Sequence, residues 1–100
     1  MTSEKAQSGD KELVGNVMIP NLKGLHARAS AQFVKCAEAF DAEVRVSHEG
    51  QTVLGTSIMG LMMLAAGKGC LLEIKASGPQ ANEALASLLE LVGAGFNEEE

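Results

Sequence analysis

Hydrophobic and polar positions follow successive patterns along the first half of the chain. β-forming residues fill positions 13–19 and end at Pro20, which predicts a strand. Apolar residues then recur at helical spacing and predict a helix over residues 27–40. Valines alternate with charged residues over 42–47, so we expect a strand with one solvent-exposed face, and residues 52–54 provide the return strand of a hairpin. The apolar positions of the predicted helix are Ala27, Ala31, Val34, Ala37 and Phe40.

The second half of the chain predicts a short helix, a strand and a longer helix. Residues 58–66 are apolar and follow Ser57, whose hydroxyl can accept a hydrogen bond from an unpaired N–H group, so Ser57 should cap a short helix. Glycines interrupt the chain at 67–69, and residues 70–76 are typical of a strand. The segment 77–79 opens the last helix with a proline in its first turn. This helix should bury Leu85, Leu88, Leu89 and Val92 and end at Gly93 and Gly95.

The element order β-α-β-β-α-β-α predicts an α+β fold in two layers. Three helices on one face of a four-stranded antiparallel sheet give an open-faced sandwich. Residues 1–11 are polar and without periodicity, so we expect a flexible N-terminal extension. The folded domain is expected over residues 12–97, followed by a solvent-exposed acidic tail, residues 98–100.

Composition limits the core and the partners. The 100 residues include only three aromatic residues, so the core should consist of small aliphatic residues padded by methionine. A net charge of −5 argues against a general nucleic-acid binder, which needs a basic surface to displace counterions. If the protein binds phosphate, it must therefore do so at one small site and not through a broad basic surface.

Cysteine usage and hydropathy indicate a cytoplasmic protein. Cys36 and Cys70 lie far apart and form no C-x-x-C motif, so buried free thiols are expected rather than a disulfide or a metal site. The N-terminus lacks an apolar signal region, and the longest apolar stretch, residues 61–66, is too short to cross a bilayer. We therefore expect a soluble protein without membrane contacts.

The segment Gly24-Leu25-His26-Ala27-Arg28 carries the candidate chemistry. It places an imidazole where the first helix should begin and a guanidinium two positions later. The first N–H groups of a helix have no intrahelical partner, and with the helix dipole they attract anions. A nucleophilic ring nitrogen beside them can hold a phosphoryl group. The residues alone leave a second interpretation open, in which His26 is a loop or capping residue without chemistry.

Together with residues 55–62 (GTSIMGLM), this segment resembles the two signature segments of HPr, the histidine-containing phosphocarrier family of the phosphoenolpyruvate-dependent phosphotransferase system. The resemblance covers residues 13–96 and implies the sheet order 1-4-2-3. The segments 40–44 and 76–80, with residues 83–85 and the ending Gly95-Phe96, further resemble the nitrogen-related branch, NPr.

The resemblance implies a role for each residue of the first motif. His26 matches the phospho-acceptor, which takes a phosphoryl group on Nδ1 from enzyme I and passes it to an enzyme IIA protein. Arg28 matches the arginine that neutralises this group, and the backbone N–H groups of Ala27 and Arg28 are expected to face it. Such a carrier is a monomer and a covalent intermediate without turnover of its own, and it needs no metal or cofactor.

One position departs from the family pattern. The motif usually continues with proline after the arginine, but Ala29 stands here. Proline in a first helical turn fixes φ and lacks an N–H that would be unpaired anyway. We expect the helix to form with a less rigid start, at a cost below about 1 kcal/mol.

The second motif implies regulation and docking. Ser57 matches the serine that HPr kinase/phosphorylase modifies in some bacteria, although a plain helix cap explains it equally well. Leu25, Met59 and Met62 are expected to contact partners, because adaptable methionines suit a carrier that must fit several of them.

Two alternatives remain at the level of sequence. A ferredoxin-like regulatory domain has nearly the same element order and would bind a small molecule without covalent change, but its sheet order is 4-1-3-2. A purely regulatory HPr relative would act through Ser57 alone, against which the presence of His26 and Arg28 argues.

Overall fold

The computed structural model describes residues 12–98 of the chain. The predicted flexible extension, residues 1–11, and the end of the predicted tail, residues 99–100, lie outside the described residues. Within 12–98, no helix combines the length and apolar character needed to cross a membrane.

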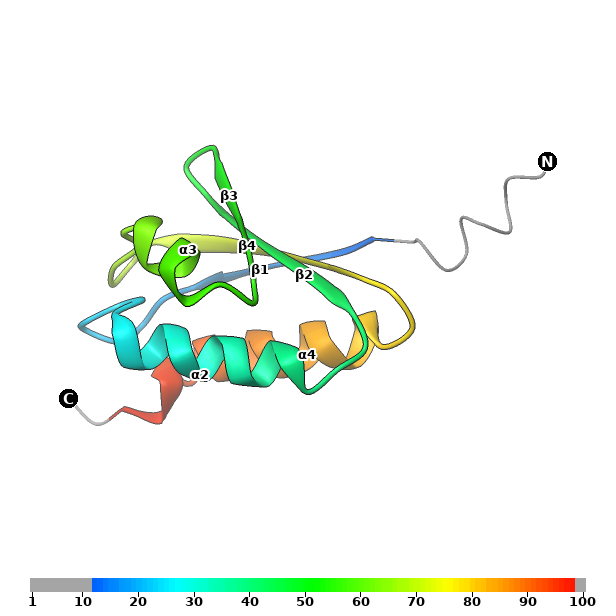
Figure 1. Cartoon of the computed structure of the whole chain (residues 1–100). Coiled ribbons are helices and arrows are strands. Elements are labelled where there is room, and N and C mark those ends of the chain that lie inside the picture. The colour runs from blue at the N-terminus through cyan, green and yellow to red at the C-terminus, as the bar shows by residue number, and fades with distance from the viewer. Residues whose placement is uncertain (1–11, 99–100) are drawn as a thin grey trace.

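Four antiparallel strands form one sheet in the order β1-β4-β2-β3 (Figure 1). This order confirms the expected 1-4-2-3 arrangement and differs from the 4-1-3-2 order of the ferredoxin-like alternative. Glu49 and Gly50 both have positive φ and make the two-residue turn that right-twisted hairpin strands require. The strands are β1 (Leu13–Met18), β2 (Glu43–His48), β3 (Gln51–Leu54) and β4 (Leu71–Ser77).

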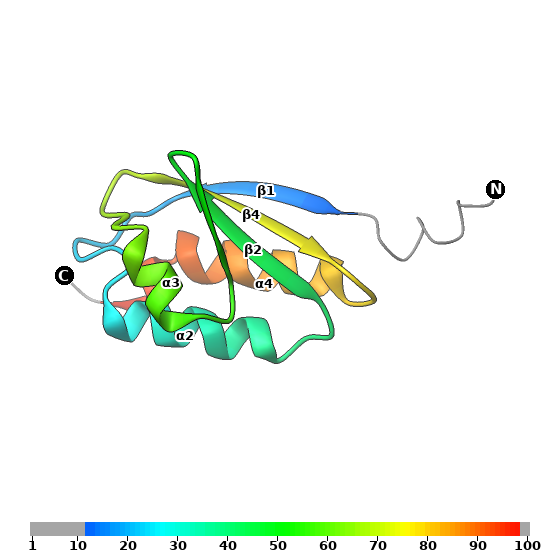
Figure 2. The ribbon, with the colours of Figure 1, turned by 45° about the horizontal axis from the view of Figure 1, so that its top comes forward.

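The helices lie on one side of the sheet, as expected (Figure 2). Two long helices, α2 and α4, run side by side in opposite directions, and the short α3 packs on α2 and β3. A final 3₁₀ turn, η1, follows α4 and was not predicted. The ranges are α2 (Ala27–Glu38), α3 (Ile58–Met63), α4 (Ala81–Gly93) and η1 (Gly95–Asn97).

The core is aliphatic and centred on two phenylalanines, Phe33 and Phe96, both fully buried. Methionine does not pad it as expected, since each methionine from residue 12 to residue 98 is exposed. The predicted inner face of α2 is partly wrong, because Ala27 and Ala31 are exposed. Alanine is tolerated on either side of a helix, so it carries little information about which side faces inward. The buried residues of α2 are Ala29, Ser30, Phe33, Val34 and Ala37.

The last helix begins at Ala81, two residues later than the expected first turn at Pro79. A tertiary contact sets this start, because Gln80 donates its backbone N–H to the carbonyl of Asp41, and the Gln80 side chain accepts from the N–H of Asp41. Leu88 and Val92 are buried as predicted, whereas Leu85 and Leu89 are half-buried against the core. Both cysteines are free as expected but only partly buried.

Candidate functional site

His26 stands at the N-terminus of α2, at the end of a loop that the fold holds in place. Its extended backbone (φ −77°, ψ −179°) makes it the N-cap of the helix. Shortly before it, Gly24 has φ +60°, and a Cβ there would lie 2.4 Å from the carbonyl oxygen of Ala66. The same carbonyl accepts a hydrogen bond from the N–H of Leu25 (3.0 Å). These contacts fix the position from which His26 projects.

The N-terminus of α2 keeps its N–H donors available for an anion. In the described part of the chain no side chain caps it, and its first turn contains no acidic residue. In α3, by contrast, the hydroxyl of Ser57 accepts a hydrogen bond from the N–H of Gly60 (2.9 Å), which confirms the predicted cap. α2 therefore offers unpaired donors and the positive end of its dipole beside the imidazole.

Cationic side chains border the same place. An open hollow of about 630 Å³ adjoins His26 and is lined by Lys23 and Arg28 as well as by Ala27. Arg28 is exposed and belongs to none of the ion pairs found within residues 12–98. The structure thus brings His26, Arg28 and the first N–H groups of α2 to one hollow, and the guanidinium is available to a dianionic group.

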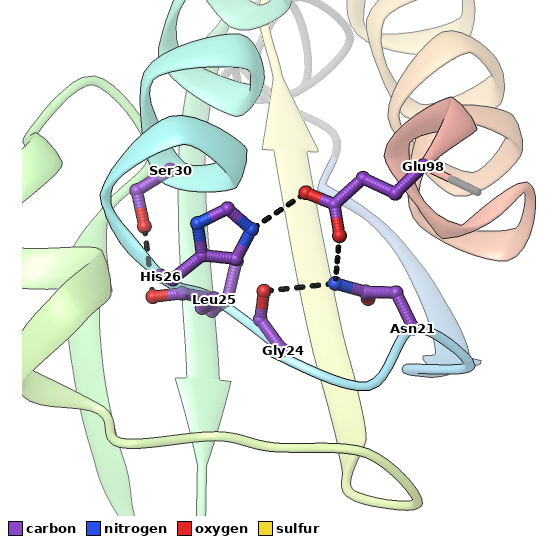
Figure 3. A network of polar contacts seen from close by, with 6 residues as sticks. All are labelled: Asn21, Gly24, Leu25, His26, Ser30 and Glu98. Atoms are coloured by element: carbon purple, nitrogen blue, oxygen red, sulfur yellow. Dashed lines mark hydrogen bonds and ion pairs between the residues drawn. The ribbon is translucent and has the colours of Figure 1, made fainter. Parts of the chain in front are cut away.

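A carboxylate that the sequence analysis missed touches the imidazole. Nε2 of His26 and Oε2 of Glu98 are joined by a hydrogen bond of 2.6 Å (Figure 3). The hydrogen bond from His26 lowers the pKa of Glu98 from its ordinary value, and a weaker contribution comes from Asn21. The Glu98 side chain is only 15% exposed, so the expectation of a solvent-exposed acidic tail is wrong for this residue.

The turn around Phe96 brings Glu98 to His26. After α4, Gly95 (φ +67°), Phe96 (φ +58°) and Asn97 (φ +60°) turn the chain in the left-handed region while the Phe96 side chain enters the core. Positive φ is costly for a residue other than glycine, and burial of the phenyl ring offsets that cost. The next residue, Glu98, then lies against His26.

Asn21 connects Glu98 to the loop before His26. This residue is 2% exposed, and its Nδ2 donates to Oε1 of Glu98 and to the carbonyl of Gly24, each at 3.1 Å (Figure 3). Ser30 adds a further tie, because its buried hydroxyl donates to the carbonyl of Leu25 (3.2 Å). Loop, helix start and chain end are thus joined in one polar network.

The residues expected to contact partners divide into exposed and buried ones. Met59 and Met62 lie on α3 and are 71% and 41% exposed. Met63 on the same helix is 73% exposed, and the sequence analysis did not single it out. Leu25 is 5% exposed and packs in the core, so the expected partner contact of this residue is corrected.

Ala29, the position that departs from the family pattern, lies in the first turn of α2 and is fully buried. Its N–H precedes the first residue whose N–H bonds back into the chain, since Ser30 donates to the carbonyl of His26 (2.8 Å). Proline at this position would therefore remove no hydrogen bond formed within residues 12–98.

We expect Ala29→Pro to raise the free energy of unfolding by about 0.4–1 kcal/mol, because proline restricts the unfolded chain. Urea titration of the two proteins measures the difference. Ala31→Pro is the control, since an exposed position further along α2 loses an intrahelical bond and should be destabilised by about 3 kcal/mol. A less stable Ala29→Pro protein would show that the buried site does not accept the ring.

This fold, with an imidazole at an uncapped helix N-terminus, has the architecture of the small phosphocarrier proteins. The family described as "PTS HPr component phosphorylation site" matches residues 14–94. The chain belongs to the HPr family and functions as a phosphocarrier in a phosphotransferase system, with enzyme I and enzyme IIA-type proteins as its partners. The purely regulatory alternative is not favoured.

Relatives named HPr and relatives named NPr both support membership of this family. The chain is 45% identical to phosphocarrier protein HPr of Neisseria meningitidis serogroup B, over 85% of this chain and 96% of the relative. Identity is 39% to phosphocarrier protein NPr of Escherichia coli K12, over 83% of this chain and 93% of the relative. Among solved structures, the phosphocarrier protein HPr of Bacillus anthracis superposes with a TM-score of 0.79 at 37% identity, over 83% of this chain and 99% of that one.

Proposed function

We propose that the protein carries the phosphoryl group on His26, accepting it from phospho-enzyme I and passing it to an enzyme IIA-type protein. The observation that carries this proposal is the position of His26 at the uncapped N-terminus of α2. The His26 side chain is 26% exposed, which leaves the ring open to a donor and then to an acceptor. Its Nδ1 takes part in no hydrogen bond with residues 12–98, so no group in this part of the protein blocks that nitrogen.

Charge stabilisation supplies the rest of the chemistry. The backbone N–H groups of Ala27 and Arg28 are first-turn donors, and the exposed guanidinium of Arg28 neutralises the dianionic group. Phosphoryl transfer needs mainly such positioning and charge stabilisation. The protein is then itself the covalent intermediate, without turnover of its own, metal or cofactor.

Incubation with phosphoenolpyruvate and the cognate enzyme I tests the proposal. Intact-mass spectrometry should show a gain of one acid-labile phosphoryl group, which leaves the protein again when an enzyme IIA is added. No gain with an enzyme I that phosphorylates its usual carrier would defeat the proposal.

Partners are proposed to dock on the exposed apolar residues of α3. Met59 and Met62 present flexible side chains beside α2, since α3 packs directly on that helix. A small surface that serves two partners in turn fits a transient interface below about 1,200 Å² in total area. Because this surface must be free to bind each partner in turn, we propose that the carrier is a monomer.

We expect the double variant Met59→Glu/Met62→Glu to raise the KM for enzyme I by about tenfold or more, since it replaces apolar contacts with charges. Steady-state transfer assays measure this value. Met18→Glu is the matched control, because Met18 is also exposed but lies on β1, away from α3. Equal effects of the α3 and β1 changes would refute the proposed docking surface.

Ser57 is proposed as a second, regulatory phosphorylation site for HPr kinase/phosphorylase. Its side chain is partly exposed and is followed directly by the exposed residues Ile58 and Met59. A phosphate there would place two negative charges in the apolar docking surface, where desolvation of the charges weakens binding.

We expect stoichiometric phosphorylation of Ser57 with ATP and HPr kinase to slow transfer from enzyme I by about tenfold or more. The unmodifiable variant Ser57→Ala should retain transfer while losing about 1 kcal/mol of stability with its cap. Transfer that proceeds equally fast with phosphorylated Ser57 would exclude this form of regulation.

The nitrogen-related branch and a cytoplasmic location are part of the same proposal. The segments 40–44 and 76–80 support the branch, since they resemble NPr, and relatives of both names match the chain: NPr at 39% identity and HPr at 45% and 46%. The free thiols of Cys36 and Cys70 suit a reducing compartment. Comparing transfer to nitrogen-related and sugar-specific enzyme IIA proteins distinguishes the branches.

A further inference from the structure

We propose that Glu98 and Asn21 are positioning residues for phosphoryl transfer, which fix the tautomer of His26 so that Nδ1 is the nucleophile. The proposal rests on the proposed function of His26 as acceptor. Its basis is the polar network of Figure 3, in which Asn21, Glu98 and His26 follow one another through hydrogen bonds.

Glu98 determines which nitrogen of the imidazole carries the proton. An ionised carboxylate can only accept hydrogen bonds, so Glu98 at 2.6 Å requires a proton on Nε2 of His26. In a neutral ring the lone pair then lies on Nδ1. Figure 3 shows this nitrogen on the side of the ring that faces the first turn of α2. The lone pair and the anion-binding N–H groups are therefore on the same side.

Asn21 is held in one orientation by its hydrogen bonds. Its Nδ2 lies between two acceptors, Oε1 of Glu98 and the carbonyl of Gly24, so the amide has only one favourable orientation. The side chain is buried and cannot turn into solvent. Asn21 therefore holds one carboxylate oxygen and leaves the other aimed at His26, while it also braces the loop that carries the imidazole.

Transfer of the phosphoryl group places a positive charge on the imidazole ring. The Nδ1 lone pair forms the new N–P bond, while the P–N bond to the histidine of enzyme I breaks and its electron pair returns to that nitrogen. The proton on Nε2 of His26 stays in place, so the phosphorylated ring is a cation. Glu98 lies against this cation, and the charge that develops on the ring is stabilised without any proton having to leave. Because the proton stays on Nε2, the electron pair of the breaking N–P bond returns to Nδ1 in the next transfer and the ring leaves as a neutral imidazole.

The test reads the tautomer of the unphosphorylated protein from its ¹⁵N chemical shifts, at a pH where the ring is neutral. Wild-type protein should show the Nε2–H form, and Glu98→Gln should increase the Nδ1–H fraction, because an amide can donate to Nε2 as well as accept. Glu90→Gln is the matched control, because Glu90 is an exposed residue of α4, and it should keep the wild-type spectrum.

The same variants are then compared in transfer from enzyme I. Glu98→Gln should accept the phosphoryl group at least about tenfold more slowly, with Glu90→Gln unchanged. Asn21→Asp should act in the same direction, because its carboxylate repels Glu98, and its thermal unfolding transition shows whether the variant is folded. A wild-type tautomer and a wild-type rate in Glu98→Gln would overturn the positioning role. Absence of phosphorylation in the wild-type protein would instead overturn the function proposed for His26.

Discussion

The variant His26→Ala is expected to take up no phosphoryl group from phosphoenolpyruvate and enzyme I, because it removes the nucleophile itself. The substitution lies at a partly exposed N-cap whose side chain caps nothing, so the fold should survive. Loss of the contact with Glu98 changes the end of the chain but leaves the core around Phe33 intact. Intact-mass spectrometry of the wild-type and variant proteins gives the comparison, and circular dichroism confirms that both are folded.

His48→Ala is the matched control for this experiment. His48 is the other histidine of the chain and lies at the end of β2, with Nδ1 near the carbonyl of Leu71 (3.4 Å). It lies at the end of a strand and not at the start of a helix, so this variant should be phosphorylated like the wild-type protein. A phosphoryl group that persists in His26→Ala and disappears in His48→Ala would reverse the assignment.

Gly24→Ala should destabilise the protein by about 2–4 kcal/mol, since it combines strain at positive φ with a collision between the new Cβ and backbone atoms. The Cβ would lie 2.4 Å from the oxygen of Ala66 and 2.6 Å from Cα of Gly67. Neither is the end of a flexible side chain, so the loop before His26 must move. Phosphoryl acceptance should therefore slow as well. Urea unfolding and the transfer assay measure the two effects.

Gly50→Ala separates the two causes. Gly50 also has positive φ (+84°), but its Cβ would meet nothing within 4 Å. This variant should lose only about 1 kcal/mol, the cost of the left-handed conformation alone. Equal losses at Gly24 and Gly50 would show that the contact with Ala66 does not determine the loop.

Local sequence patterns predicted the helices and strands, because turn-forming and capping residues mark their ends and the spacing of apolar residues marks their type. Pro20, the hairpin turn at Gly50 and the cap at Ser57 all stand where an element ends or begins. Errors arose where no local signal exists. The apolar run 58–66, for example, does not show where the short helix ends: the helix ends at Met63 and Ala65 turns to φ +54°, although alanine is otherwise the best helix former.

The candidate site was predictable only as far as it is local. His26 and Arg28 are two residues apart, so sequence spacing alone placed them at one helix end. Glu98 is 72 residues from His26, and its approach depends on the buried, left-handed Phe96. Nothing in the sequence signals positive φ at a phenylalanine, so this contact emerged only from the tertiary structure.

The central claim is that the phosphoryl group resides on Nδ1 of His26 while Nε2 keeps its proton toward Glu98. The most direct measurement is nuclear magnetic resonance of the ¹⁵N-labelled protein after phosphorylation by phosphoenolpyruvate and enzyme I. We expect ¹⁵N–³¹P coupling at Nδ1 of His26 and a proton on Nε2. Coupling at Nε2, or phosphorus on any other residue, would contradict it.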